Sequence, residues 1–401
     1  MRLLIPLFSP PTGTWGGLTR SIAVAEAASA AGHKVAFCAA GYLEQALQKR
    51  GYRVYPTPPT TMFGLPKPIS RLIERRSQHV SPPVKPGTSV GNIWLVLLAT
   101  GMASARHIRR LVEAEIEALQ DFQADKLFTD LDPGAYLASA ITGLPLAATY
   151  AHIATHGSGT LPWQLARRTI ARVLRSYGKA PLTPDELCFN PSVLKIIPSI
   201  PELDDTDPNR ADVCYVGQLL GPIHAAKMPD FELEQGRHYV FVYTGTGSVS
   251  LGTAQKILPL TFAESGDLDC IVGGQSIEKP FQIGAVSFYP YVPANELLPQ
   301  CDWTICHGGQ NTIIQSLVHD VPLLIFPGAI FERRYNAQKV EQAGAGQMGE
   351  VSEFTVEWLR VSLERQPEYA TGAIALGKRI RSYGGATAAV EAIEKWGKNL
   401  L

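Results

Sequence analysis

Short apolar runs alternate with amphipathic stretches along most of the chain, and segments rich in glycine or proline separate them. Residues 3–8 form one apolar run, loop-type residues follow over 9–17, and residues 18–31 carry apolar side chains at helical spacing. Gly32 stands where a helix-ending glycine is expected, and residues 34–38 form the next apolar run. Continuous apolar runs are typical of strands covered by helices on both faces, so this segment predicts a βαβ unit of a parallel, doubly wound sheet.

The same alternation continues towards the C-terminus. Further strands are predicted at residues 54–55, 126–130, 146–150, 239–243, 270–272, 286–288, 303–306 and 322–326, and further helices at 103–119, 133–142, 310–319, 335–343 and 386–398. The proline-rich stretch 57–92 is predicted to be irregular or partly helical and to serve as a binding loop. Its cluster of Arg71, Arg75 and Arg76 is interpreted as the solvated face of a short helix, with an acidic acceptor or an anionic membrane surface as the alternatives.

Proline and aspartate become frequent over residues 198–236, where we place a linker between two domains. The predicted architecture is α/β, with two Rossmann-like domains over residues 1–205 and 206–383. A terminal helix over 384–401 is expected to pack back on the first domain. Residues 93–98 are expected to line a cavity or the core.

Composition narrows the class of protein. The 401 residues include 36 Lys and Arg against 36 Asp and Glu, and this balance argues against a nucleic-acid-binding protein. The hydrophobic fraction of 45% excludes a largely disordered chain. Six cysteines without a C-x-x-C spacing predict neither a zinc site nor a disulfide framework, and they favour a reducing, cytoplasmic location. The sequence shows no signal-peptide pattern and no apolar run long enough to span a bilayer, so we expect a soluble protein.

The strongest chemical signal is the sequence His-Gly-Gly-Gln-Asn-Thr at residues 307–312, where a predicted strand meets a predicted helix. Two glycines let the backbone turn sharply and approach a ligand, and the first turn of the helix offers unpaired N–H groups to an anion. Asn311 and Thr312 would add side-chain donors, and His307 would donate to a phosphate oxygen. The pattern therefore predicts a phosphate cradle without a lysine, and the alternative is a plain strand–helix turn with a capping threonine.

Short motifs lie on both sides of this junction. V-P, L-L and C-D pairs lie within residues 291–302, and a V-P…P stretch lies around 322–327. An N-A pair lies within 331–337, and a G-A-G turn lies at 344–346. In order and spacing this train resembles the donor site of the UDP-glycosyltransferase superfamily (glycosyltransferase family one), in its bacterial macrolide and natural-product branch. Residues 2–37, 129–145 and 216–217 support the resemblance more weakly. It implies a GT-B fold and inverting, metal-free transfer of a sugar from a UDP- or dTDP-sugar to a small or lipidic acceptor, without a cofactor.

The resemblance also implies roles for individual residues. His307 would contact the donor phosphate, and the backbone of Gly308 and Gly309 would hold further phosphate oxygens together with Asn311 and Thr312. Val292 would offer backbone hydrogen bonds to the pyrimidine base. Thr244 and Ser248 would line the cleft near the phosphates.

Two positions depart from the family pattern. Glu332 and Arg333 stand where the family has an Asp-Gln pair that hydrogen-bonds to the sugar hydroxyls. Arg333 would add a cation that binds an acidic sugar or a donor phosphate. The alternative is that Arg333 points to solvent. The family's loop histidine, which serves as the general base, is replaced by Gly17 in the Gly16-Gly17 pair. A glycine cannot accept a proton, and His33 matches a structural position.

Other bases remain open. Asp130 matches the aspartate that normally orients the missing histidine and would act directly or through one water. Its neighbour Asp132 is expected to cap the helix at Pro133, and His152 and His156 follow the next strand. A third alternative is an acceptor oxygen that is already acidic, in which case Gly16 and Gly17 would make room for it.

Two other functions also remain open at this point: a silent homologue that activates a partner transferase, and a sugar-nucleotide epimerase. The oligomeric state is left open, with a homodimer among the alternatives.

Overall fold

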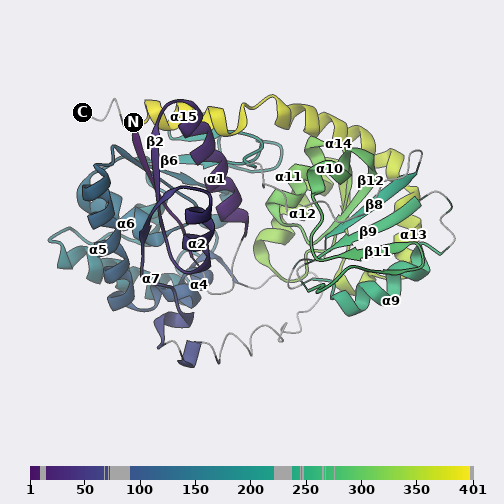
Figure 1. The fold of residues 1–401 in the computed structure, drawn as a ribbon, viewed down its shortest axis with the longest axis horizontal. Helices are drawn as coiled ribbons and strands as arrows, with labels where there is room; N and C mark the ends of the chain where they lie inside the picture. Colours follow the sequence, from purple (N-terminus) through teal and green to yellow (C-terminus); the bar gives the residue numbers. More distant parts are fainter. Residues whose placement is uncertain are drawn as a thin grey trace.

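The computed structural model describes residues 1–9, 15–66, 68–70, 72, 91–220, 237–243, 245, 248–263, 266, 268–274 and 276–397. Two seven-stranded sheets packed with helices form two lobes that lie side by side (Figure 1). The N-terminal lobe holds the purple-to-teal part of the chain in Figure 1, and the C-terminal lobe holds the green part. This is the predicted pair of Rossmann-like domains with parallel sheets.

The first sheet has the strand order β3-β2-β1-β4-β5-β6-β7, and all its pairs are parallel. Its strands are β1 (Arg2–Pro6), β2 (Lys34–Ala39), β3 (Arg53–Pro56), β4 (Lys126–Thr129), β5 (Leu146–Thr149), β6 (Val193–Ile197) and β7 (Val213–Tyr215). Its helices are α1 (Trp15–Ala30), α2 (Tyr42–Lys49), α4 (Ile93–Leu97), α5 (Ala105–Phe122), α6 (Pro133–Thr142), α7 (Leu161–Ser176) and α8 (Pro184–Cys188). Short helical turns are η1 (Met62–Gly64), η2 (Leu98–Met102) and η3 (His152–Thr155).

The second sheet has the order β10-β11-β9-β8-β12-β13-β14, with β10 alone antiparallel to its neighbour. Its strands are β8 (His238–Tyr243), β9 (Leu268–Gly273), β10 (Phe281–Ile283), β11 (Val286–Tyr289), β12 (Cys301–Cys306), β13 (Leu323–Ile325) and β14 (Gly346–Met348). Its helical elements are α9 (Leu251–Thr261), α10 (Ala294–Leu297), η4 (Leu298–Gln300), α11 (Gln310–Val318), α12 (Phe331–Gln342), η5 (Val351–Glu353), α13 (Val356–Glu364) and α14 (Gln366–Arg381).

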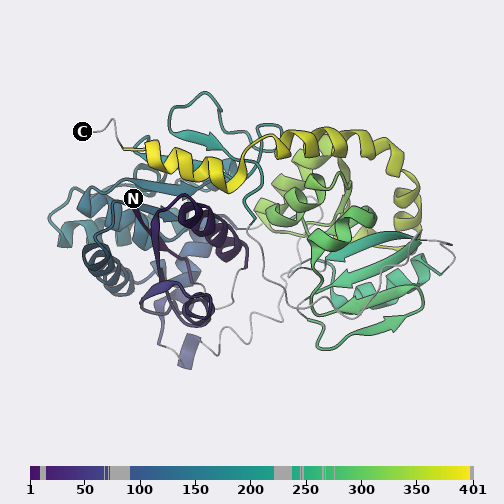
Figure 2. The same cartoon turned by 45° about the horizontal axis from the view of Figure 1, so that its top comes forward.

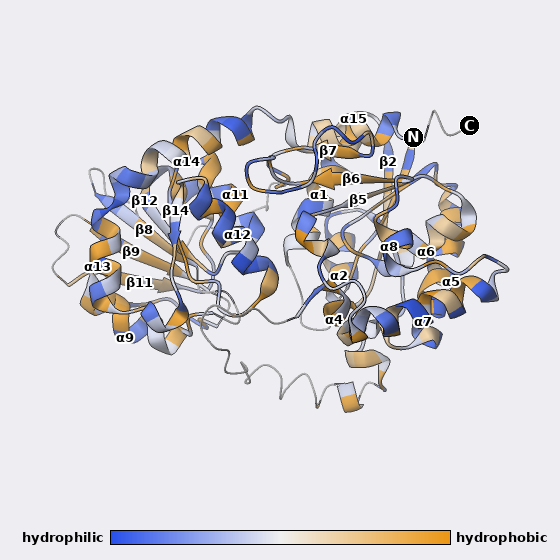
Figure 3. Ribbon diagram, turned by 180° about the vertical axis from the view of Figure 1, so that it is seen from behind, coloured by the Kyte–Doolittle hydropathy of each residue, from blue (hydrophilic) through white to orange (hydrophobic). Residues whose placement is uncertain are grey.

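The strands are apolar on both faces because helices cover both sides of each sheet. On β1, Leu4 packs into one hydrophobic cluster of the lobe, whereas Leu3 and Ile5 pack into the other. Figure 3 shows the strands of both sheets in orange. Trp94 is 1% exposed and packs with α5 and α6 in the first cluster, so the segment 93–98 belongs in part to the core, as expected.

Several predicted segments differ from the structure in extent. The helix predicted at 335–343 begins at Phe331, which places Glu332 and Arg333 in its first turn. The strand β7 pairs with β6, so the first sheet extends past residue 205, and the domain boundary there stays a prediction. The predicted cluster of Arg71, Arg75 and Arg76 lies outside the described residues. No helix in the described part of the chain is both long and apolar enough to cross a membrane.

A helix from the C-terminus returns to the N-terminal lobe, as predicted. α15 (Gly385–Lys395), yellow in Figure 2, lies against α1, and its Ala389, Val390 and Ile393 are buried in the core of that lobe. The Lys126 ammonium group of β4 donates hydrogen bonds to the carbonyls of Ile393 (2.7 Å) and Glu394 (2.9 Å). A cation at the C-terminal end of a helix satisfies carbonyls that have no partner inside the helix.

Replacing Lys126 by Ala should therefore lower the free energy of unfolding by about 1.5–3 kcal/mol, because a charged donor to several carbonyls is lost. Urea unfolding of the full chain would measure the change. Lys49→Ala, at an exposed position at the end of α2, is the control and should change stability by less than about 0.5 kcal/mol. Equal unfolding midpoints for the two variants would contradict the role of Lys126.

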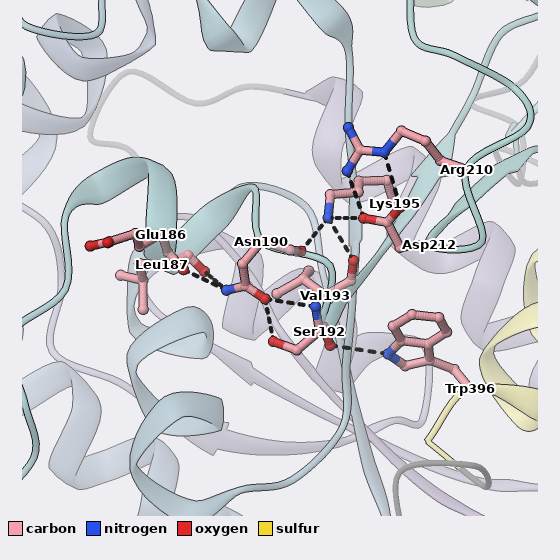
Figure 4. Close-up of polar contacts among 9 residues, drawn as sticks. All are labelled: Glu186, Leu187, Asn190, Ser192, Val193, Lys195, Arg210, Asp212 and Trp396. Carbon is pink, nitrogen blue, oxygen red and sulfur yellow. Dashed lines mark hydrogen bonds and ion pairs between the residues drawn. The ribbon is translucent and has the colours of Figure 1, made fainter.

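A buried lysine joins β6 to β7 at the edge of the first sheet (Figure 4). Lys195 is 1% exposed, and its ammonium donates to Asp212 (2.6 Å) and to the carbonyl of Val193 (2.9 Å). Arg210 also donates to Asp212, at 2.7 Å. Burial lowers the pKa of Lys195, and the Asp212 carboxylate opposes that shift. The Trp396 indole donates to the carbonyl of Ser192 (3.3 Å), so the same edge anchors the segment after α15.

Candidate functional site

The turn between β12 and α11 needs glycine at two successive positions. Gly308 has a φ of +85°, and a Cβ there would lie 2.9 Å from the carbonyl oxygen of Arg333. A Cβ at Gly309 would lie 2.7 Å from Nε2 of His307. Asn336 of α12 donates to the Gly308 carbonyl at 3.0 Å and holds the turn in place. The backbone therefore passes closely between His307 and α12, as the phosphate cradle requires.

His307 lies at the bottom of this turn as a neutral imidazole. Burial and the charge of Arg333 lower the pKa of His307 to about 3, although the Tyr243 carbonyl acts in the opposite direction. The ring of Tyr243 lies 5.4 Å from the imidazole, centroid to centroid. A Cβ at Gly245 would lie 2.5 Å from Nδ1, so this neighbouring turn also needs glycine. At neutral pH the imidazole therefore offers one N–H donor and no charge.

The C-terminal lobe has a pocket beside His307. Tyr243, Ser248, His307 and Phe326 are among the residues that line it. The Ser248 hydroxyl donates to the carbonyl of Phe326, which ties the loop before α9 to the end of β13. Ser248 and His307 thus meet at one place, as the resemblance implies, whereas Thr244 lies outside the described residues.

The N-terminus of α11 faces the same region with Asn311 and Thr312 in its first turn. Gly309 is the N-cap residue, and no side chain of the described residues caps this helix. The first amides of an uncapped helix have no partner within the helix and carry the positive end of its dipole. This end of α11 is therefore suited to an anion.

Glu332 and Arg333 face different neighbours from the first turn of α12. Burial lowers the pKa of Arg333, while the charges of Glu332 and of groups on Cys306 and Tyr243 act to raise it. Arg333 is thus half-buried, and its charge acts on His307. It adds a cation to the region of His307, and Glu332 faces Arg20 of the other lobe.

Val292 lies in the loop after β11 and is 7% exposed. Its side chain packs with Phe241, Ile271 and Leu297 in a small hydrophobic cluster at the same edge of the sheet. The side chain is structural, and the base-binding role of its backbone stays a prediction.

On the N-terminal lobe, Asp130 occupies the space beside Gly17. A Cβ built on Gly17 would overlap Oδ2 of Asp130, which follows β4 and is 4% exposed. By contrast, the nearest atom to a Cβ on Gly16 is Nδ2 of Asn311, at an ordinary 3.5 Å. Because residue 17 has no side chain, the Asp130 carboxylate occupies the space that a Cβ there would need.

Arg20 is the residue of this site that the sequence analysis missed. Its Nε donates to Oδ1 of Asp130 at 2.9 Å, and its Nη2 donates to Oδ2 at 3.0 Å. Burial acts to lower the pKa of Arg20, but the Asp130 carboxylate and Glu332 outweigh it, so the pKa is raised. The only available signal was spacing, since Arg20 follows Gly17 by about one helical turn and shares its side of α1.

Arg20 also connects the two lobes. Its Nη1 donates to Oδ1 of Asn311 at 2.8 Å, across a separation of 291 residues in the sequence. Asp130 in addition accepts a hydrogen bond from Thr149. The Asp130 carboxylate is therefore the counter-charge of a guanidinium that is 14% exposed, and breaking such a pair costs about 3–5 kcal/mol. This arrangement argues against Asp130 as the general base, a role that stays a prediction.

His152 lies at a second contact between the lobes. Its backbone N–H donates to Asp204 (2.8 Å), and its side chain acts electrostatically on Asp205. Asp205 in turn accepts from the Tyr335 hydroxyl of α12 at 3.1 Å. Among the described contacts, none joins His152 to Asp130 or His307, and its catalytic role stays a prediction.

The described residues contain no group of three or more His, Cys, Asp or Glu side chains that could hold a metal ion.

Comparison with known proteins supports the donor-site resemblance. Residues 280–381 match the family described as "Erythromycin biosynthesis protein CIII-like, C-terminal domain". The chain is 35% identical over 151 residues to the 3-alpha-mycarosylerythronolide B desosaminyl transferase of Saccharopolyspora erythraea, covering 35% of each protein. It is 27% identical over 271 residues to the 4'-demethylrebeccamycin synthase of Lentzea aerocolonigenes, covering 57% of this chain and 62% of the synthase. The matches thus span less than two thirds of these curated relatives.

Solved structures show the fold over the whole chain. The glycosyltransferase VinC, crystallised in complex with dTDP, has a TM-score of 0.72 at 19% identity, with 100% of both chains covered. SnogD from Streptomyces nogalater has a TM-score of 0.69 at 17% identity, with 98% of both chains covered. These similarities show that the chain has the two-lobed GT-B fold of these glycosyltransferases, and that its residues 280–381 are similar to the EryCIII-like C-terminal domain.

Proposed function

We propose that the protein transfers a sugar from a pyrimidine nucleoside-diphosphate donor to a small-molecule natural-product acceptor. The observation that carries the proposal is the start of α11, where the first amides are uncapped and neutral His307 and Arg333 lie close by. The natural-product relatives and the dTDP complex of VinC support a UDP- or dTDP-sugar as the donor.

The chemistry follows from where charge develops during transfer. As the bond between the anomeric carbon and the diphosphate oxygen breaks, negative charge builds up on the diphosphate. Donors that already point at that position stabilise the charge without reorganising. Because the acceptor would approach from the N-terminal lobe, on the side of the sugar opposite the diphosphate, we propose inversion at the anomeric carbon.

A thermal-shift panel tests the donor site. UDP and dTDP should raise the unfolding temperature, and a ligand at a hundred times its Kd stabilises the fold by about 2.7 kcal/mol. ADP and GDP are the matched controls, since they carry the same diphosphate on a purine. UDP-glucose and dTDP-glucose are then incubated with a panel of phenols and neutral alcohols, and release of the nucleoside diphosphate is measured. No stabilisation by any of the four diphosphates would overturn the proposal.

The two alternative functions are not favoured, since the relatives reported above are named as a transferase and a synthase and the solved structures as glycosyltransferases. The same incubations distinguish an epimerase and a silent homologue from a glycosyltransferase. A new sugar nucleotide formed without an acceptor would indicate an epimerase, and donor binding without any turnover would indicate a silent homologue.

We also propose a cytoplasmic location, which the six free cysteines support. A homodimer would be tested by the mass of the protein in light scattering.

A further inference from the structure

A small pocket in the N-terminal lobe is lined by other residues than the pocket beside His307. Ser9 after β1, Thr60 after β3 and Asp132 after β4 line it together with His107 of α5. These residues follow the carboxyl ends of parallel strands, the edge of a doubly wound sheet at which ligands bind. The pocket therefore opens at the edge from which Asp130 and Arg20 reach the C-terminal lobe.

Asp132 presents a buried carboxyl group to this pocket. It is 3% exposed, and its Oδ1 accepts the amide N–H of Gly134 at 2.7 Å as the N-cap of α6, as the sequence predicted. Burial raises the pKa of Asp132 to about 6, although the Gly134 and Ala135 amides and Glu115 act to lower it. A carboxylate near this pKa can hold or release a proton close to neutral pH.

Glu115 of α5 backs Asp132 and is fully buried, at 0% exposure. Burial and the neighbouring Asp132 raise its pKa well above the ordinary value, so it is a neutral acid beside Asp132. Gly134 makes room for it, since a Cβ there would lie 2.6 Å from Oε1 of Glu115. No ion pair within the described residues includes either carboxyl group.

A buried polar atom of another residue at the pocket has no hydrogen-bond partner among the described residues. Nε2 of His107 is buried, and no described residue hydrogen-bonds to it. Burial and the charge of Arg110 lower the pKa of His107, so the ring is neutral. A buried polar atom without a partner is costly, and a hydroxyl group of a ligand would satisfy it.

Asp132 and Asp130 differ in their partners. Asp130 is held in an ion pair by Arg20, whereas no cation among the described residues pairs with Asp132. Asp132 also lines a pocket, with His107 beside it. Of the two aspartates after β4, Asp132 is therefore the one suited to accept a proton during turnover.

We propose that Asp132, supported by Glu115, is the general base of this chain, and that its pocket takes the reacting hydroxyl of a neutral alcohol acceptor. This inference rests on the proposed glycosyl transfer. The acceptor O–H bond breaks and its proton moves to Asp132, while the oxygen's electron pair forms the bond to the anomeric carbon. The bond from that carbon to the diphosphate breaks, and its electrons leave with the diphosphate at α11. Asp132 then returns the proton to solvent.

Asp132→Asn is the direct test, because Asn caps helices as well as Asp and preserves the bond to Gly134. With UDP- or dTDP-glucose and a neutral alcohol from the acceptor panel, kcat should fall by about 10²- to 10⁴-fold, the range of general-base catalysis. With 4-nitrophenol above neutral pH, where the acceptor is already ionised, kcat should change by less than about threefold. Asp121→Asn, at an exposed position of α5, is the matched control and should leave both reactions unchanged.

The pH profile tests the support from Glu115. The titratable groups that face the pair are Cys38 of β2 and Tyr136 of α6, and His107 of α5 shares the pocket with Asp132. For the neutral alcohol, the acid limb of kcat should lie near pH 6 and remain there in Glu115→Gln, which mimics the protonated acid. In Glu115→Met the limb should move to higher pH, since the Glu115 carboxyl group that acts to lower the pKa of Asp132 is removed. Titration of protein labelled with ¹³C at the Asp carboxyl groups, in the presence of UDP, gives the same pKa without turnover.

Two results would overturn the inference: an Asp132→Asn enzyme that glycosylates the neutral alcohol at the wild-type rate, or one that loses both acceptors equally. Either can occur while UDP and dTDP still bind and sugar is still transferred, so the failure is distinct from a failure of the proposed function. The latter would appear as no donor binding in the wild-type protein.

Discussion

Replacing His307 by Ala should weaken the binding of UDP or dTDP by about 10- to 100-fold, because a hydrogen bond to a charged group contributes about 1.5–3 kcal/mol. The imidazole lies where the backbone turns into α11, with Gly245 and Gly309 shaped around it. Isothermal titration calorimetry would measure the loss. His319→Ala, at the other end of the same helix, is the control and should bind as the wild type does.

A second variant tests whether the position of the His307 imidazole matters when the residue itself is kept. In Gly309→Ala the new Cβ would lie 2.7 Å from Nε2 of His307, so the imidazole must move. We expect a loss of affinity similar to that of His307→Ala. Gly252→Ala, in the first turn of α9, is the matched control, because its Cβ would lie 4.0 Å from the nearest atom. Wild-type affinity in both His307→Ala and Gly309→Ala would remove His307 from the donor site.

The lowered pKa of His307 also predicts the pH dependence. Because the folded-state pKa is about 3, the imidazole stays neutral from pH 5 to 8, and affinity for UDP-glucose should not rise as the pH falls through 6.5. The unfolded chain protonates this histidine near pH 6.5, whereas the folded chain resists protonation until about pH 3. Stability should therefore fall as the pH is lowered below 6.5, and His307→Gln should lose less of it. An increase in affinity at pH 5.5 that disappears in His307→Gln would contradict the neutral ring.

Replacing Gly17 by Ala should disrupt the site far more than replacing Gly16 by Ala. A Cβ on Gly17 would overlap the Asp130 carboxylate and separate it from Arg20, and breaking a buried ion pair costs about 3–5 kcal/mol. Gly16→Ala is the matched control, with the same substitution in the same helical turn and an ordinary nearest contact of 3.5 Å. Urea unfolding gives the stabilities, and donor KM and kcat give the effect on the site.

The link from Arg20 to Asn311 makes the functional effect specific. Displacing Asp130 also disturbs the hydrogen bond by which Arg20 holds Asn311 of the donor lobe, so donor KM should rise together with the loss of stability. Gly17→His should behave like Gly17→Ala and should not gain a base, since its Cβ meets the same carboxylate. Equal stability and equal KM in Gly16→Ala and Gly17→Ala would show that Asp130 moves aside freely.

Much of the fold follows from local patterns in the sequence. The helix predicted at 133–142 has those bounds, with Asp132 as its cap and Pro133 in its first turn. Apolar periodicity predicts such elements because each depends on neighbours only a few residues away. The strands β6, β7, β10 and β14 and several helices of both lobes were not predicted. β7, β10 and β14 have three residues each, too few for a periodic pattern. In β6 the apolar run is interrupted by Lys195, whose burial depends on Asp212, just before β7.

The features of the candidate site likewise divide into those that a local sequence pattern predicts and those that depend on distant residues. The sequence by itself determined the parallel α/β organisation and the turn at residues 307–312, because a glycine pair between a strand and a helix acts through backbone conformation within a few residues. Only the tertiary structure decided what surrounds Gly17 and Asp132. Arg20 meets Asp130 across 110 residues and Asn311 across 291, and Glu115 meets Asp132 through the packing of α5 on α6. Burial and pairing at such distances set which carboxylate is held in an ion pair and which is free to take a proton, and no local pattern contains that information.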